Sequence, residues 1–163
     1  VIKLTESLRE ETSAMNQMIS SGMLKDVQDP SKTFVIPKTK PPVPVLNFTP
    51  VQNAVGRLRE SARAYQSAAN EKRVPSAVQN ALDEVLYRSE RILTRPEGLP
   101  RRDWFRHHIY APGFYTGYGV KTLPGIREAI EQRNWKEAEE QILIAAKLIE
   151  QFATAIDRAA GMY

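Results

Sequence analysis

Residues 134–160 read NWKEAEEQILIAAKLIEQFATAIDRAA and carry the strongest periodic pattern in the chain. Apolar side chains recur every three or four residues, as they do along one face of an α-helix. They are Trp135, Ala138, Ile142, Ala145, Ile149, Phe152 and Ile156. A second apolar edge widens this face, at Leu143, Ala146, Leu148 and Ala153. A helix that is apolar on more than one stripe lies at the centre of a bundle or at an interface.

Other segments upstream also have helical periodicity. Residues 3–22, the segment from Thr49 to about residue 70, and residues 75–93 each place apolar side chains on one face. A short helix is predicted to begin near Pro124. No segment alternates convincingly between apolar and polar residues, so the pattern indicates a bundle of four main helices.

Capping residues set the expected helix ends. Asn134, with Glu137 three residues later, is a favourable start for the last helix. Thr49, Pro50 and Gln52 form a Thr-x-x-Gln capping box with proline at the first helical position. Between the first two helices, residues 26–48 are rich in proline, which favours an extended crossover over a helix. The predicted fold class is therefore all-α, a four-helix bundle with a long Pro-rich crossover and a long aromatic loop.

Length and composition fit one globular domain over residues 1–163. The chain has 163 residues, of which 42% are hydrophobic and 26% charged. Because it begins with Val1 and not with Met, we expect it to be a fragment of a longer chain. No run of apolar residues is long enough to span a bilayer, and we expect no membrane contact by this domain.

A search for catalytic chemistry finds no complete site. There is no cysteine, and the two histidines, His107 and His108, are adjacent, which is a poor spacing for a shared metal ion. There is also no Gly-x-Ser-x-Gly elbow and no glycine-rich phosphate loop. We therefore expect no catalytic residue, no metal site and no cofactor in this domain. The formal charge of +4 leaves one alternative, a freestanding basic bundle that binds nucleic acid. The excess charge is small and spread out, so we expect no nucleic-acid partner.

One segment points to function. Residues 104–125 read WFRHHIYAPGFYTGYGVKTLPG and hold Trp104, Phe105, Tyr110, Phe114, Tyr115 and Tyr118. Loops of this length in compact domains are usually functional or disordered. Aromatic side chains with polar tips are suited to lining a ligand cleft or an interface.

The same region resembles a known family. Residues 98–125 follow the pattern Gly-Leu-Pro, Trp-Phe-Arg-His, Ile-Tyr-Ala-Pro, Tyr and Leu-Pro-Gly-Ile. This pattern resembles the C-terminal helical domain of glutamate carboxypeptidase II and its relatives. The transferrin receptor has the same type of domain, which is called its dimerisation domain. In outline the resemblance extends over the rest of the chain.

The resemblance implies a division of labour. The parent chain would join a zinc peptidase domain, an inserted apical domain and this helical domain. The two zinc ions and the catalytic groups would lie on the peptidase domain, and the helical domain would form much of a homodimer contact. Its aromatic loop would contact the peptidase domain of the same parent chain and help to close the substrate pocket. An extracytoplasmic location is implied by the resemblance alone.

The resemblance also nominates site residues. Tyr118 aligns with a tyrosine that binds the substrate's terminal carboxylate, while Gly117 stands where the family has a lysine. Glutamate specificity is therefore not implied, and Lys121 is a second, weaker candidate. For the dimer interface we expect contributions from Ile142, Ile149 and Phe152, and the pattern does not separate core from interface. A receptor-like relative with a dead peptidase domain is the other reading of the same resemblance.

Overall fold

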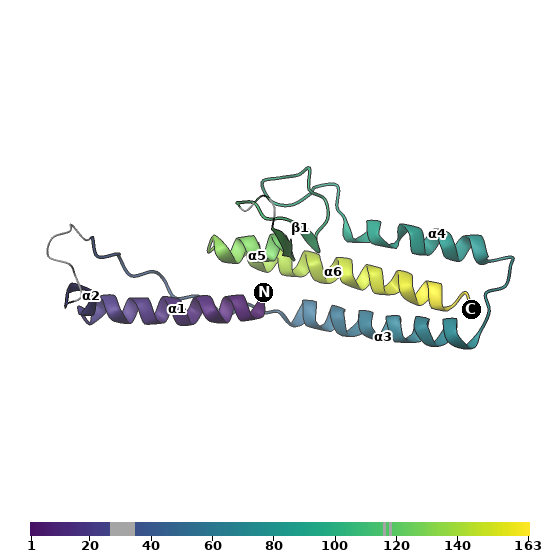
Figure 1. Ribbon diagram of the computed structural model, residues 1–163, viewed down its shortest axis with the longest axis horizontal. Coiled ribbons are helices and arrows are strands. Elements are labelled where there is room, and N and C mark those ends of the chain that lie inside the picture. Colours follow the sequence, from purple (N-terminus) through teal and green to yellow (C-terminus); the bar gives the residue numbers. More distant parts are fainter. Residues whose placement is uncertain (27–34, 116, 118) are drawn as a thin grey trace. The chain divides into compact units, whose positions relative to one another are not determined.

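The computed structural model describes residues 1–26, 35–115, 117 and 119–163. The chain divides into two compact units, Val1–Val45 and Leu46–Tyr163, and each is considered by itself. Helices make up most of the described chain (Figure 1), so the predicted all-α class is confirmed in its broad form. A bundle of four main helices stays a prediction. Within the described residues, no helix has the length and apolar character needed to cross a bilayer.

The first unit is a helix with an extended segment tied to it. It contains α1 (Ile2–Ser20) and the single turn α2 (Met23–Asp26), separated by Gly22 at a φ of 78°. Arg9 donates to the carbonyl oxygens of Val43 and Pro44, at 3.3 and 2.9 Å. The side-chain amide of Asn16 both donates to and accepts from the backbone of Lys40. Residues 35–48 are extended or irregular, as the prolines predict, and residues 27–34 of the predicted crossover lie outside the described residues.

The second unit is built around its last helix. Its elements are α3 (Thr49–Glu71), α4 (Gln79–Ser89), the 3₁₀ turn η1 (Glu90–Leu93), β1 (Tyr110–Pro112), β2 (Val120–Thr122), α5 (Pro124–Glu131) and α6 (Trp135–Ala160). The long helix α6 packs against α3, α4 and α5 (Figure 1). Two contacts tie α3 to α6 and the C-terminus. Arg57 pairs with Asp157 at 3.1 Å, and the hydroxyls of Tyr65 and Tyr163 lie 3.2 Å apart.

The apolar face of α6 forms the core of this unit. Ala138, Ile142, Ala145, Ile149 and Ala153 are all buried. Alanines at three of these positions let the neighbouring helix approach closely. The sequence pattern of residues 134–160 therefore predicted the helix and most of its buried face, although Leu143 of the second apolar edge is 60% exposed.

One predicted helix cap is confirmed and another is wrong. The side chain of Asn134 accepts from the N–H of Glu137, as predicted, at 3.3 Å. At the start of α3, however, Thr49 is already helical and forms no capping box. The side chain of Asn47 accepts from the N–H of Thr49 at 3.0 Å instead. The helix begins one residue earlier than the Thr-x-x-Gln pattern implies, with Phe48 at the cap position, so Thr49 is not free to cap it.

A small antiparallel sheet lies in the region predicted as a loop. Strands β1 and β2 pair Tyr110 with Thr122, Ala111 with Lys121 and Pro112 with Val120. Each strand has three residues, which is too short for an alternating pattern to be recognised. This hairpin leads directly into α5 through Leu123, which has a φ of 51°.

Candidate functional site

The aromatic loop, residues 94–123, is attached to the helices at its base. The backbone N–H of His108 donates to the carbonyl of Leu93, and that of Arg95 donates to the carbonyl of Arg106, both at 3.0 Å. Gly98 turns the chain with a φ of 66°. A Cβ atom at this position would lie 2.1 Å from the carbonyl oxygen of Asp103, so only glycine fits. The base of the loop therefore has a closely packed backbone.

A buried ion pair holds the loop onto α5. Arg102 is bonded to both carboxylate oxygens of Glu128, at 2.7 and 2.8 Å. The two side chains are only 3% and 4% exposed. Arg102 also donates to the carbonyl of Pro112, and Glu128 accepts from the N–H of Phe114 at 2.8 Å. This pair thus binds the backbone on both sides of Gly113, where the chain leaves β1.

Aromatic rings flank the same guanidinium. Its central carbon lies 5.3 Å from the ring centroid of Phe105 and 5.8 Å from that of Phe114. These are cation–π distances, and burial of the pair strengthens such contacts. The Nε atom of Arg102 is buried and has no partner among the described residues. Arg102 therefore organises the underside of the aromatic loop.

The sequence alone did not reveal this pair. Neither Arg102 nor Glu128 stands out in the sequence as a candidate site residue. The two residues are 26 positions apart, in a loop and a helix, so no local spacing rule connects them. One weak sequence signal for a buried Glu128 can be named in retrospect. Glu128 lies on the side of α5 that also carries the buried residues Gly125 and Ala129.

The tip of the loop, from Gly113 to Gly119, is closed by backbone hydrogen bonds. Gly113 donates to the carbonyl of Gly119 at 2.9 Å, and Gly117 donates to that of Gly113 at 3.3 Å. Gly117 has a φ of 59°, with open space around the position of a Cβ atom. Tyr118 lies outside the described residues, so its role toward a substrate stays a prediction.

Lys121 is placed on β2, facing α5. It is 8% exposed, and its ammonium group pairs with the carboxylate of Glu131. Burial alone would raise the pKa of Glu131, but hydrogen bonds from Lys121 and Arg127 outweigh it and lower that pKa. The ammonium of Lys121 already has a carboxylate partner within the domain. A contact between Lys121 and a substrate stays a prediction.

The outer surface of the loop exposes aromatic rings. Trp104 is 70% exposed and Tyr115 is 75% exposed. Tyr110 is also accessible, and its hydroxyl donates to Glu90 at 2.5 Å. Large exposed aromatic residues gathered on one segment are typical of interaction surfaces. The loop therefore has a buried, charged underside and an exposed, aromatic outer side.

The two histidines are packed into the base of this loop. The Nδ1 atom of His107 accepts from the N–H groups of Ile109 and Tyr110, at 3.2 and 3.3 Å. His108 is 3% exposed, and burial lowers its pKa to about 4. Within the described part of the chain, no three His, Asp or Glu side chains gather as metal ligands would.

The predicted dimer residues differ in burial. Ile142 and Ile149 are 1% and 6% exposed, so they belong to the core of the second unit. Phe152 is half-buried. On the same helix, Leu143 is 60% exposed and is the more accessible apolar side chain. Contact of any of these residues with a second copy stays a prediction.

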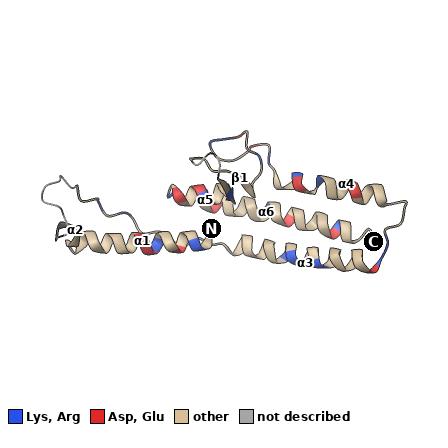
Figure 2. Ribbon diagram, viewed as in Figure 1, with Lys and Arg blue, Asp and Glu red and all other residues tan. Residues whose placement is uncertain are grey.

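Charges of both signs lie along the helices. Figure 2 shows Lys and Arg interspersed with Asp and Glu on α1, α3 and α4. Several pair with each other, as Arg57 does with Asp157 and Arg127 with Glu131. The net positive charge is therefore distributed over the described elements.

Comparison with known families identifies the second unit. Residues 46–157 match the transferrin receptor-like dimerisation domain. The match begins at Leu46, where the second compact unit also begins.

The chain belongs to the transferrin receptor-like dimerisation domain family. The resemblance stated from residues 98–125 is thereby confirmed. This family assignment rests on most of the chain, including α3, the aromatic loop and nearly all of α6.

Curated relatives of this dimerisation domain include proteins named probable glutamate carboxypeptidase. A probable glutamate carboxypeptidase of Arabidopsis thaliana (LAMP1) is 35% identical over 75 residues, which cover 42% of this chain and 11% of that protein. A probable glutamate carboxypeptidase of Arthroderma benhamiae is 30% identical over 109 residues, which cover 65% of this chain and 15% of that protein. A probable glutamate carboxypeptidase of Zea mays (VP8) is 32% identical over 81 residues, which cover 50% of this chain and 11% of that protein. The dimerisation domain thus corresponds to a small part of each of these proteins.

Proposed function

We propose that this chain is the homodimerisation and substrate-pocket-capping domain of a glutamate-carboxypeptidase-like zinc peptidase. The family match supports the dimerisation role, and the names of the relatives support a peptidase parent. In this proposal two zinc ions and the catalytic groups belong to the parent's peptidase domain, which supplies the hydrolytic chemistry. In this proposal the domain described here binds and orients the substrate and keeps water out of the pocket.

The capping role rests on one observation, the two-sided aromatic loop. Its underside is held by the buried pair of Arg102 and Glu128, and its outer side exposes Trp104 and Tyr115. A loop held in one place gives up little conformational entropy when its exposed rings meet a partner. Such a loop is suited to form one wall of a pocket whose other walls come from the peptidase domain.

Dimerisation is tested by analytical ultracentrifugation of the chain over a range of concentrations. An obligate dimer interface buries on the order of 2,000 Å² or more in total. We expect a concentration-dependent dimer that Leu143→Asp weakens, because the charge would be placed in an apolar contact. Glu139→Asp, also on the exposed part of α6, is the matched control and should leave association unchanged. A strict monomer at the highest concentration contradicts the proposal.

Pocket capping is tested in the full-length protein loaded with zinc. Tyr118→Phe and Trp104→Ala are expected to raise the KM for acidic peptide substrates several-fold while the circular dichroism spectrum is unchanged. Tyr87→Ala, which removes an exposed aromatic side chain on α4, is the control. Kinetic constants unchanged by both loop variants would remove the loop from the pocket. Complete absence of peptide hydrolysis in the parent protein would favour a receptor-like relative instead.

A further inference from the structure

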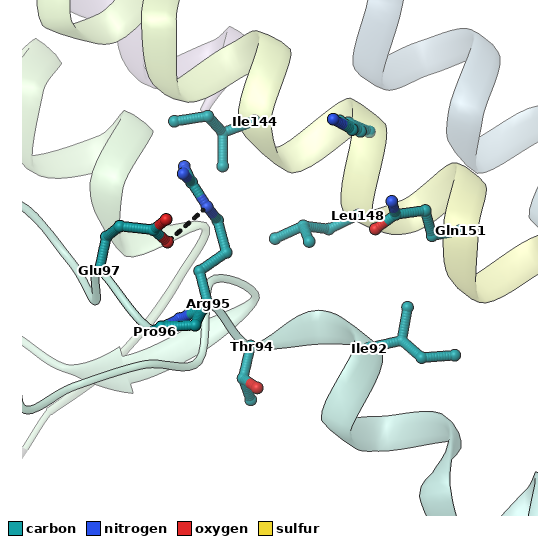
Figure 3. A pocket seen from close by; sticks show the side chains of 9 residues that line it. Ile92, Thr94, Arg95, Pro96, Glu97, Ile144, Leu148 and Gln151 are labelled. Carbon is teal, nitrogen blue, oxygen red and sulfur yellow. Dashed lines mark ion pairs between the residues drawn. The ribbon is translucent and has the colours of Figure 1, made fainter.

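A cavity unrelated to the aromatic tip lies beside α6. It has a volume of about 630 Å³ and is walled by residues 92–97 on one side and residues 144–151 of α6 on the other (Figure 3). This volume is within the range of sites that hold small organic ligands. The cavity is formed entirely by the second unit.

The floor of this cavity is apolar. Ile92, Ile144 and Leu148 contribute hydrocarbon side chains from η1 and α6, as Figure 3 shows. Leu148 is 6% exposed, so it closes the cavity toward the core. A ligand that fills this space must therefore bring an apolar group.

Two cationic side chains lie at the same cavity. The Nε atom of Arg95 is 3.2 Å from a carboxylate oxygen of Glu97, the ion pair drawn in Figure 3. The side chain of Arg95 is 32% exposed, and this ion pair occupies its Nε atom and not its two terminal nitrogens. Lys147 lines the cavity from α6. An arginine fork and a lysine with donors to spare are the groups that bind a carboxylate.

A groove between α4 and α6 adjoins the cavity. The groove has a volume of about 500 Å³ and shares Ile92 and Gln151 with the cavity. Val85 and Ala155 add apolar surface along it. From Leu148 to Ala155, α6 rises by roughly 10 Å, which is the length of a medium hydrocarbon chain.

We propose that the cavity and groove bind a carboxylate with an extended hydrocarbon tail, such as a medium-chain fatty acid. The carboxylate lies against the Arg95 fork and the Lys147 ammonium group, and the tail follows Ile92 and Leu148 toward Val85 and Ala155. The charges of the walls agree with this occupant. Arg95 and Lys147 line the cavity against one acidic residue, Glu97, while in the groove Arg88 is paired with Glu84. This proposal does not depend on the dimerisation or pocket-capping proposals.

The first test is calorimetric titration of the chain with three probes. Decanoate is the expected ligand, decanamide keeps the tail without the charge, and butyrate keeps the charge with a short tail. We expect decanoate to bind about tenfold more tightly than decanamide, because charge-assisted hydrogen bonds are lost with the amide. Butyrate is expected to show no binding over the same range. Equal affinities for decanoate and decanamide would overturn the proposal.

Variants then locate the charge contacts. Arg95→Gln and Lys147→Met are each expected to weaken decanoate binding several-fold and to leave decanamide binding unchanged. Lys136→Met removes an exposed lysine of α6 outside the cavity and is the matched control. If Lys136→Met weakens decanoate binding as much as Lys147→Met does, the effect reflects only the net positive charge of the chain, and the proposed site is wrong.

Methyl NMR spectra distinguish this site from another hollow. A smaller space of about 260 Å³ is lined by Val55, Ile149 and Phe152 with other apolar residues. Decanoate is expected to shift the methyl signals of Ile92 and Leu148. Shifts confined to Val55 and Ile149 would place the tail in the other hollow and overturn the assignment. Binding that survives Ile144→Trp, which fills the cavity, would also contradict it.

Discussion

At the scale of single residues, two neighbouring arginines make the same kind of bond in different surroundings. Arg101 pairs with Glu137 through both terminal nitrogens, at 2.7 and 2.8 Å, and its side chain is 38% exposed. Arg102 binds both carboxylate oxygens of Glu128 through a single terminal nitrogen, and its side chain is only 3% exposed. Desolvation makes the buried pair costly to break, because removing one partner leaves a charge that water cannot reach.

The first prediction compares these two arginines. Arg102→Met leaves Glu128 buried and unpaired and is expected to lower the free energy of unfolding by about 3–5 kcal/mol. Arg101→Met removes a more exposed pair and is expected to cost about 1 kcal/mol or less. Urea denaturation followed by circular dichroism measures both. Equal losses for the two variants would show that burial of the Arg102 pair has no energetic consequence.

Glycine substitutions provide the second prediction. Gly98 and Gly117 both have positive φ, but only Gly98 has backbone atoms where a Cβ would lie. Gly117→Ala is expected to cost roughly 1–2 kcal/mol, the price of a left-handed alanine. Gly98→Ala adds a clash with Asp103 and is expected to cost distinctly more, with loss of the loop structure. Thermal unfolding of the two variants, measured side by side, tests this order, and a reversed order contradicts it.

At the scale of elements, the loop base and η1 are joined through His108. Burial is the main cause of its lowered pKa, and the charges of Arg95 and His107 add to it. The folded state therefore keeps this imidazole neutral well below pH 6.5, the usual pKa of an unfolded histidine. Between pH 6.5 and about pH 4 the unfolded chain binds more protons than the folded one.

The third prediction follows from that difference. Stability is expected to fall as pH is lowered from 7 through this window, by up to about 1.4 kcal/mol for each pH unit. His108→Gln removes the titrating group and is expected to show a smaller loss between pH 7 and pH 5. Urea midpoints at pH 7, 6 and 5 measure the two slopes. Parallel slopes for the variant and the parent chain would mean that His108 does not control this dependence.

Elements with strong local patterns were predictable from the sequence. Residues 134–160 have both a helical repeat and the Asn134 cap, and α6 forms as predicted with its apolar face buried. The start of α3 was misassigned because Asn47 and Thr49 are both good capping residues only two positions apart. Local sequence does not decide between two such candidates.

Long-range pairs in the site were not predictable in the same way. The contact between Arg102 and Glu128 depends on where the loop meets α5, and the strand pair depends on a hairpin with three-residue strands. Likewise, the apolar pattern that contains Ile142 and Leu143 cannot separate core from surface, because adjacent positions on a broad apolar face differ only in their neighbours. The structure buries Ile142 and exposes Leu143.

At the scale of the whole molecule, the two units differ in what they contain. The family match covers residues 46–157, which lie entirely within the second unit. That unit has its own buried core, drawn from α3, α5 and α6. A compact unit with its own core can fold independently.

The fourth prediction is that residues 46–163 fold without residues 1–45. We expect the truncated chain to unfold cooperatively and to keep the near-ultraviolet circular dichroism of its aromatic residues. A second truncation that removes residues 1–71, and with them α3, is the control and should abolish cooperative unfolding. Loss of cooperative unfolding in the first truncation would mean that the first unit completes the core.

The pairing of α3 with α6 has a further consequence during protein synthesis. Arg57 and Asp157 are 100 residues apart in the sequence, although they meet in the folded unit. At ribosomal rates of about 5–20 residues per second, α3 emerges roughly 5–20 seconds before its partner has been made. During that interval the apolar side of α3, with Val51 and Ala54, faces water or a chaperone. Within this unit, the helix that is made last is therefore the one that gives the first helix a place to pack.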